Sequence, residues 1–425
     1  MTTSHRYLVK LDCRNGRFAF RQCCLGKKSE GIMTITVGFG RLGIITLFLA
    51  LAPATLASNW FVDGVNGNDN NSCRSRQHAC KTISNAIFLT LPGDSIFVAS
   101  ATYHESVLVP YNLNFIGSDA KTTILHCRGD SCQAFVVGTE PRVPVTVSGM
   151  TFRGSNGLVD SGGGIYNCFG TLTVTDSIIT GNNIRGGNGT FGYGGGIYNC
   201  PSSTLTLINT TISENSAEIG GAICNGGALM IINSTFSGNV AHGPKGGGIA
   251  NYGFLSITNS TFSGNSSGGL AGGILNGGLF QSAGTILINN STFSGNSAGD
   301  GGGIFNVKGS MVFVHNSIVA NNAGENCHGT FNSIGYNLSS DNSCTFDDAG
   351  DLNNTDPLLG PLQNNGGPTE TMALLPGSPA IDAGNPRGCR DGKGPLLKTD
   401  QRGEPRPDRE DKTGCDIGAY ERQSD

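Results

Sequence analysis

The sequence predicts an all-β protein, a single right-handed parallel β-helix solenoid with a short N-terminal capping helix and an irregular C-terminal cap. Three observations predict this fold: 66 glycines gathered in clusters among 425 residues, a unit that recurs between residues 161 and 326, and short β-rich runs between the glycine clusters. A chain of this length either divides into domains or repeats one unit, and the recurrence favours repetition.

The recurring unit has two landmarks and a variable length. It opens with a motif such as GGGIYNC at 162–168 and closes with a motif such as STFSGN at 234–239. The isoleucine of the opening motif stands at positions 165, 197, 223, 249, 274 and 304. Successive isoleucines are therefore 25 to 32 residues apart. A repeat of this length is too short for a four-stranded propeller blade, and leucine does not recur as in a leucine-rich repeat. Each unit is therefore predicted to be one coil of two or three short strands, turned by glycines and stacked at about 4.8 Å.

Stacked coils place equivalent side chains above one another, so the repeats predict columns. An inward asparagine can hydrogen-bond from coil to coil because its amide both donates and accepts. The predicted asparagine columns are Asn167, Asn199, Asn225, Asn251, Asn276 and Asn306, and Asn182, Asn215, Asn239, Asn265, Asn296 and Asn321. The apolar column between them is Ile179, Ile212, Phe236, Phe262, Phe293 and Ile318. Each buried apolar side chain contributes about 1.5–3 kcal/mol.

Residues 1–57 are predicted to form a leader that ends in a signal peptide. The apolar run at 38–57 carries Arg41 near its start and small residues at its end, and it is too short for a comfortable membrane span. The residues before Met33 are unusual in such a leader, so Met33 is a hypothetical true start. The mature chain is expected to be secreted or displayed at the cell surface, without a transmembrane segment.

The mature chain is expected to be acidic. Residues 1–57 hold eight of the 27 basic and two of the 31 acidic residues, which leaves 19 basic and 29 acidic residues and a net charge of −10. No basic face for nucleic acid is expected from such a balance.

The rest of the chain divides into three regions. Residues 58–160 are predicted to form an N-terminal cap and the first degenerate coils, with the capping helix at 81–91, where apolar residues recur at helical spacing. Residues 161–326 form the repeated coils. Residues 327–425, in which proline, polar turns and charges replace the repeat, form the last coils and the C-terminal cap.

Eleven cysteines follow residue 57, and export would permit disulfides. Cys168 and Cys200 share one register in adjacent coils, where the coil spacing lies within the range of a bridge. Cys224 stands one position earlier in its coil and is predicted to stay unpaired. The remaining candidate disulfides are local pairs, Cys73–Cys80, Cys127–Cys132, Cys327–Cys344 and Cys389–Cys415.

These motifs resemble known families over nearly all of the mature chain. The GGGI-x-N and STFSGN units resemble right-handed β-helix repeat proteins of bacteria and are similar to the repeats of polymorphic outer membrane proteins. The opening FVDGVNGNDNNSC with PGDSIFVASATYHESVLV resembles the first coils of pectate-lyase-like β-helices. The ending TDPLLGPLQNNGGPTETMALLPGSPAIDAGNP with CDIGAYE resembles the choice-of-anchor Q domain. The resemblance implies an exported, surface-associated protein; since no anchoring motif follows CDIGAYERQSD, release is expected.

The leading functional prediction is a non-enzymatic exported scaffold that binds glycans or proteins through its non-repeating loops, such as 183–193 and 279–284. The alternative is a pectate-lyase-like polysaccharide lyase or glycoside hydrolase. Such an enzyme needs carboxylates and a basic residue gathered on successive coils. The charged residues of 154–325 share no column position, so no catalytic residue is predicted and the question of enzyme activity stays open.

No cofactor or metal site is predicted. The Asx-rich stretch with Asp63, Asn66, Asn68 and Asp69 could hold calcium, but it lacks the EF-hand spacing, and a plain turn is favoured. The histidines of the mature chain show no metal-ligand spacing and are expected at the surface or in turns. Glycosylation sequons occur formally at three repeated turns, Asn233, Asn259 and Asn290.

Overall fold

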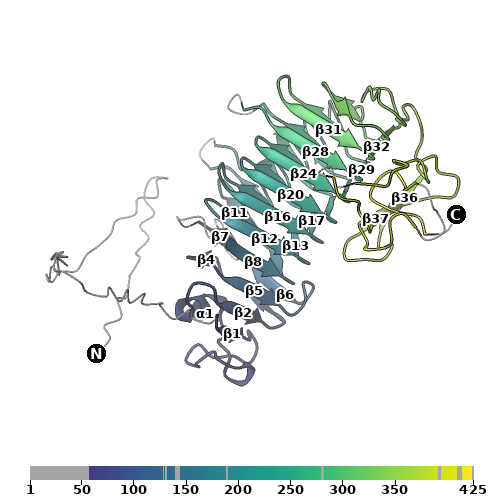
Figure 1. Cartoon of the computed structure of the whole chain (residues 1–425). Helices are drawn as coiled ribbons and strands as arrows, with labels where there is room; N and C mark the ends of the chain where they lie inside the picture. Colours follow the sequence, from purple (N-terminus) through teal and green to yellow (C-terminus); the bar gives the residue numbers. More distant parts are fainter. Residues whose placement is uncertain are drawn as a thin grey trace, which may run out of the picture. The chain divides into compact units, whose positions relative to one another are not determined.

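The computed structural model describes residues 57–127, 129, 132–138, 144–187, 190–278, 282–390, 394–408 and 414–423. Residues 1–56 of the predicted leader, including the hypothetical start at Met33, lie outside these residues. The described chain is the right-handed parallel β-helix that the repeats predict: four stacks of parallel strands, joined coil by coil. Figure 1 shows the coils following one another in sequence order from β1 toward β32.

The strands form four parallel sheets and one hairpin. The eleven-stranded sheet contains β1 (Asn59–Val62), β2 (Ser95–Val98), β5 (Asn114–Gly117), β8 (Pro144–Ser148), β12 (Thr171–Thr175), β16 (Thr204–Ile208), β20 (Ala228–Ile232), β24 (Phe254–Thr258), β28 (Thr285–Asn289), β31 (Met311–His315) and β34 (Asn332–Ser333). The ten-stranded sheet contains β3 (Ala101–Tyr103), β6 (Thr123–His126), β9 (Thr151–Arg153), β13 (Ile178–Thr180), β17 (Thr211–Ser213), β21 (Thr235–Ser237), β25 (Thr261–Ser263), β29 (Thr292–Ser294), β32 (Ile318–Ala320) and β35 (Leu338–Ser339).

The nine-stranded sheet contains β4 (Val107–Val109), β7 (Phe135–Val137), β11 (Ile165–Asn167), β15 (Ile197–Asn199), β19 (Ile223–Asn225), β23 (Ile249–Asn251), β27 (Ile274–Asn276), β30 (Ile304–Asn306) and β33 (Cys327–His328). The five-stranded sheet contains β10 (Asn156–Leu158), β14 (Asn183–Arg185), β18 (Ser216–Ile219), β22 (Val240–Lys245) and β26 (Ser266–Ser267). The antiparallel hairpin joins β36 (Leu359–Gln363) and β37 (Thr371–Leu374).

The repeat landmarks set the register of these sheets. The isoleucines of the opening motif lie opposite one another in successive strands of the nine-stranded sheet, as Ile165 does with Ile197. Alternate residues of each strand point inward, so the inner faces of the sheets share one apolar core. At its centre the rings of Phe236, Phe262 and Phe293 stack with centroid separations of 4.4 and 4.6 Å.

Two ladders of buried asparagines run along the coils. In the first ladder, Asn167 donates from Nδ2 to Oδ1 of Asn199 at 2.8 Å, and the same bond recurs up to Asn306. In the second ladder the bonds run from Asn182 to Asn296 and continue to Asn322. Apart from Oδ1 of Asn167, which has no hydrogen-bond partner at the start of the first ladder, the amides donate and accept inside the core. Side chains as well as backbone therefore connect the coils.

The sixth repeated unit corrects the prediction by one position. Asn322, and not Asn321, continues the second ladder, because Asn321 occupies the turn position with φ 57° that Gly295 fills with φ 73° in the coil before. Val319 lies opposite Phe293 in the apolar column, while Ile318 lies opposite Thr292 and points out of the coil. Ile318 is nevertheless buried, because the C-terminal segment packs over it.

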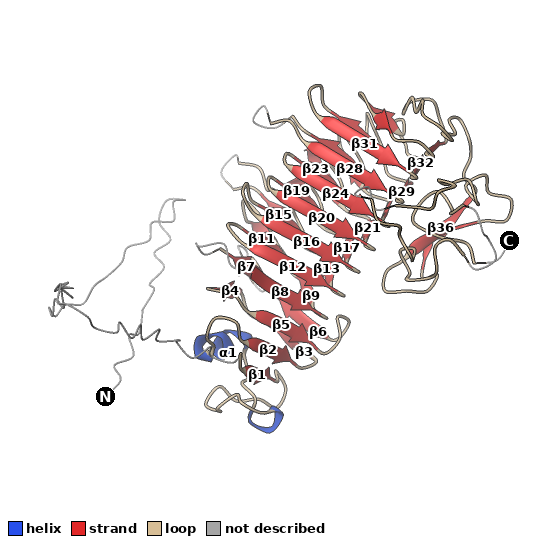
Figure 2. Ribbon diagram, in the orientation of Figure 1, coloured by secondary structure: helices blue, strands red, loops and turns tan. Residues whose placement is uncertain are grey.

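The predicted capping helix is present and shorter than expected. Helix α1 spans Ile83–Leu89 and buries Ile83, Ala86 and Ile87 over the first coil (Figure 2). Thr82 is its N-cap, and the Glu105 carboxylate accepts from the amide of Ile83 at 2.8 Å. A short 3-10 helix, Arg76–His78, precedes it. In the described part of the chain no helix is long and apolar enough to cross a membrane.

The C-terminal segment, the described residues of 354–390, 394–408 and 414–423, packs over the outer face of the ten-stranded sheet. Gln401 is fully buried there, donates to Oγ1 of Thr235 at 2.9 Å and accepts from Oγ1 of Thr261 at 2.6 Å. The buried pair Arg406 and Glu421, 2.8 Å apart, lies beside it. The threonine of the repeated STFSGN motif is therefore an outward residue that binds the chain's own C-terminal segment.

All five candidate disulfides are formed, and Cys224 is the one unpaired and buried cysteine of the described residues. Cys168 and Cys200 lie 4.9 Å apart between their Cα atoms on adjacent coils. Of the sequons, Asn259 donates to the carbonyl of Thr399 and Asn290 to that of Arg390, so both side chains are buried under the C-terminal segment.

Candidate functional site

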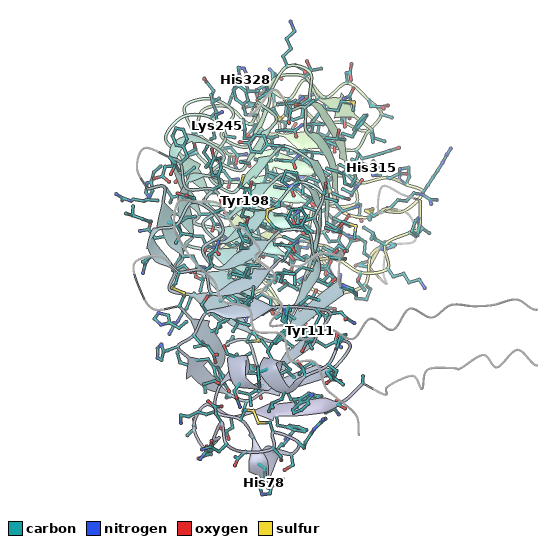
Figure 3. The ribbon with its side chains drawn as sticks, turned by 90° about the vertical axis from the view of Figure 1, so that its left-hand side faces the viewer. His78, Tyr111, Tyr198, Lys245, His315 and His328 are labelled. Carbon is teal, nitrogen blue, oxygen red and sulfur yellow. A yellow bond between two sulfur atoms is a disulfide. The ribbon has the colours of Figure 1, made fainter. Side chains whose placement is uncertain are left out.

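A cluster of tyrosines covers part of the outer face of the nine-stranded sheet. Tyr166 and Tyr198 lie opposite one another on β11 and β15, and their rings stack with centroids 5.8 Å apart and 21° between the planes. Tyr193 lies 6.2 Å from Tyr198 between ring centroids. We call Tyr166, Tyr193, Tyr198 and Tyr252 the tyrosine face. Figure 3 shows Tyr198, Lys245 and His328 along the side of the molecule turned to the viewer.

Small residues under the tyrosines make this cluster possible. Cys224 and Ala250 continue the outward column of Tyr198 on the next two strands, and Tyr193, Tyr198 and Tyr252 pack on them. Burial raises the pKa of Tyr198 to about 12 and also raises the pKa of the Cys224 thiol. The phenols therefore stay protonated at neutral pH, and the hydroxyl of Tyr252 is buried without a hydrogen-bond partner.

Two carboxylates hold the non-repeating loop beside the tyrosine face. Oε2 of Glu218 accepts from the amides of Gly186 at 3.2 Å and Gly192 at 2.7 Å. Oδ1 of Asp160 accepts from Oγ1 of Thr190 at 2.9 Å. Gly186, Thr190 and Gly192, which precede Tyr193, are thus held by side chains from neighbouring coils. Glu218 and Asp160 therefore have a structural role, since they position the backbone. No role was assigned to these two residues from the sequence.

A second aromatic feature lies on the same sheet, nearer the C-terminal end. Phe305 of β30 and His328 of β33 stack at 4.3 Å between ring centroids with 9° between their planes. Nδ1 of His328 is 2.6 Å from Oε1 of Glu325. Both rings line an open hollow of about 540 Å³ together with Lys308 and Ser310. The nine-stranded sheet therefore carries outward aromatic rings at two places along its length; the four tyrosines and Phe305 are half-buried, and His328 is exposed.

Among the residues that the structure describes, no three or more His, Cys, Asp and Glu side chains are arranged so that they could hold a metal ion. The oxygens of the Asx-rich stretch accept from the chain itself: Asp63 from the amides of Val65 and Asn66, and Asp69 from the amide of Lys81. The bonds that Asp63 accepts are those of a turn. The backbone hydrogen bond from Asn66 lowers the pKa of the Asp63 carboxyl.

The tyrosine face was missed from the sequence, although one signal was present. Tyr166 and Tyr198 occupy the variable position of GGGI-x-N in two successive units. Alternation along a strand places this position outside when the flanking isoleucine and asparagine point inward. Two identical aromatic residues at an outward position indicate an exposed aromatic pair. Both variable loops predicted from the sequence lie partly outside the described residues, the first at 188–189 and the second at 279–281.

Comparisons with known proteins find similar solved structures only. No protein-family model matches the chain, and no curated protein matches it. The pectate lyase Pel9A is 15% identical with a TM-score of 0.41, over 86% of this chain and 96% of that one. The alginate lyase from Paenibacillus sp. str. FPU-7 is 11% identical with a TM-score of 0.33, over 59% and 96%.

A third similar structure is matched over a smaller share of its own length than the first two. The GH136 lacto-N-biosidase from Eubacterium ramulus is 12% identical with a TM-score of 0.32, over 66% of this chain and 56% of that one. Likeness at this level carries no argument about what this chain does. The functional argument therefore rests on the outer faces of its own coils.

Proposed function

We propose that the chain is an exported, non-enzymatic β-helix that binds glycans on the tyrosine face. The observation that carries this proposal is the stacked, half-exposed pair Tyr166 and Tyr198, held in register by adjacent coils. An aromatic ring offers an apolar surface on which the carbon-bound hydrogens of a sugar ring can pack, while its hydroxyl bonds to the sugar's own hydroxyls.

The rigidity of this face supports binding. Both tyrosines stand on strands paired on each side, and the adjacent loop is pinned by Glu218 and Asp160. A site that is ordered before the ligand arrives loses little conformational entropy on binding. The spacing of about 4.8 Å between coils then offers a linear chain of sugars a regular series of contacts along the sheet.

The charge of the chain favours neutral glycans. With a net charge of −10 over residues 58–425, a polyanionic polysaccharide is repelled before it reaches the surface. Neutral polysaccharides meet no such barrier. This also separates the proposal from the alternative of a pectate-lyase-like enzyme, whose polymer substrate carries a carboxylate on each sugar.

Export completes the proposal. Five disulfides in the described chain fit an oxidising compartment. The predicted signal peptide and the choice-of-anchor Q-like ending support a secreted or cell-surface protein. The buried contacts of Gln401 give that ending a role in covering the coils.

Binding is tested with neutral polysaccharides such as xylan and galactomannan, beside polygalacturonate and alginate. Affinity electrophoresis should show retardation by at least one neutral polymer, and the double variant Y166A/Y198A should weaken its Kd at least tenfold, about 1.4 kcal/mol. The matched control is F88A, which removes an aromatic ring that is 80% exposed on α1. Equal binding by Y166A/Y198A and wild type would contradict the proposal.

The enzyme alternative is tested in the same samples. Incubation of each polymer with calcium, followed by measurement of reducing ends and of unsaturated uronate absorbance, should give no product above background. Turnover of polygalacturonate or alginate that survives Y166A/Y198A would replace the binding proposal with a lyase.

A further inference from the structure

Two histidines that are 22 residues apart in sequence meet on the outer face of the ten-stranded sheet. His104 follows β3 and His126 ends β6, and the pairing of Tyr103 with Leu125 places them side by side on adjacent coils. Their Nδ1 atoms are 3.2 Å apart, and the ring centroids are 5.2 Å apart with 80° between the planes. This juxtaposition arises from stacking, which is why the sequence showed no metal-ligand spacing.

A glycine in the next coil makes room for one of the two rings. A Cβ added to Gly154 would lie 2.3 Å from both Cδ2 and Nε2 of His126. Gly154 also has φ +83°, a conformation that other residues rarely adopt. The imidazole of His126 is therefore seated against backbone on its Nε2 side, with its Nδ1 side turned to His104.

We propose that His104 and His126 bind a divalent late first-row transition ion, such as Cu²⁺ or Ni²⁺, through their two Nδ1 atoms. With metal–nitrogen bonds of about 2.0–2.1 Å, the distance between two nitrogen ligands depends on the nitrogen–metal–nitrogen angle. It is about 2.9 Å when that angle is a right angle and about 3.3 Å when it is tetrahedral. The separation of 3.2 Å lies within that interval. Imidazole is a preferred ligand of these ions, and Cu²⁺ binds most strongly in the series.

The two imidazoles supply two of the ion's coordination positions. His104 is exposed, so a small rotation of its ring brings both lone pairs onto one ion without moving the backbone. The nearest carboxylate in sequence, Glu105, is already engaged, since it accepts from the amides of Ile83 and Ser84. Glu105 is therefore not counted among the ligands, and the proposal rests on the two imidazoles.

A cation in the next coil limits the affinity of this site. Arg153 lies opposite His126 in β9, on the side away from His104, and its side chain is exposed. Its charge repels a second cation at the histidine pair by an amount that falls with ionic strength. Removal of this charge should therefore strengthen metal binding, which gives the proposal a variant that gains function.

The test is isothermal titration of the tag-free full chain, its free thiols alkylated, with Ni²⁺. Wild type should bind one ion that H104Q and H126Q each lose. H78Q, which removes an exposed histidine of the 3-10 helix Arg76–His78, should bind as wild type does. R153Q should lower the Kd at least about threefold at low salt.

Electron paramagnetic resonance of the Cu²⁺ complex provides a second readout. The spectrum of wild type should show coupling to two imidazole nitrogens, and that of H104Q should not. Since His104 is exposed, H104Q is expected to fold. The proposal would be overturned if H104Q and H126Q bound Ni²⁺ with the same stoichiometry and affinity as wild type. It would also be overturned if the spectrum of the wild-type Cu²⁺ complex showed no coupling to imidazole nitrogens.

Discussion

Replacement of Asn322 by alanine measures what one rung of the asparagine ladder contributes. The Asn322 amide donates to the carbonyl of Phe293 at 3.1 Å and to Oδ1 of Asn326 at 3.0 Å. Its Oδ1 accepts from the backbone and side chain of Asn296 at 3.0 and 2.9 Å. Four bonds at about 1 kcal/mol each, with their partners left buried, predict a loss of about 3–4 kcal/mol in the free energy of unfolding.

The adjacent residue supplies the control. Asn321 is exposed at φ 57°, a conformation that glycine adopts freely, so N321G should change stability by less than about 0.5 kcal/mol. Urea unfolding followed by circular dichroism compares the two variants, and hydrogen exchange of the peptide that contains β29 and β32 localises the effect. A loss in N321G that equals or exceeds the loss in N322A would refute the register and the ladder argument together.

Three further predictions concern the core, the C-terminal segment and pH. Phe262 is stacked on both sides, so F262A should cost about 3–5 kcal/mol by urea unfolding, while F169A, at a ring that is 46% exposed, should cost less than about 0.5 kcal/mol; equal losses would contradict the central stack. Gln401→Ala removes the bond to Thr235 and should speed limited proteolysis of the C-terminal segment and hydrogen exchange in β21 and β25; unchanged rates would show that the segment is held elsewhere. Burial lowers the pKa of His315 in the folded chain, so the unfolded chain takes up the proton first and stability is lost as pH falls from about 7 toward 5. H315Q should reduce the slope of the unfolding midpoint over that interval, and identical slopes would contradict the assignment.

The repeated part of the fold could be predicted from the sequence because its determinants are local. Glycine turns, inward asparagines and alternating apolar residues each occur at fixed offsets, and stacking converts them into columns. The error at Asn321 has the same origin. In the last unit, asparagine fills both the positive-φ turn and the ladder position, and two neighbouring asparagines look alike in sequence.

The outward residues could not be predicted in the same way. Thr235 looks like a repeat residue, but its partner Gln401 is 166 residues further along the chain. The pair of His104 and His126 depends on which coils become neighbours, and that follows from the lengths of degenerate coils that carry no landmark. Binding surfaces on a solenoid are therefore set by long-range stacking, whereas its core is set by the unit itself.

Hydrogen exchange in the presence of the neutral polysaccharide that binds best tests the central proposal most directly. Bound glycan should slow exchange in β11, β15 and the loop at 186–193, and should leave β12, β16 and the C-terminal segment unchanged. Y166A/Y198A should abolish this protection at the same polymer concentration. Protection confined to the eleven-stranded sheet or to the C-terminal segment would contradict binding at the tyrosine face.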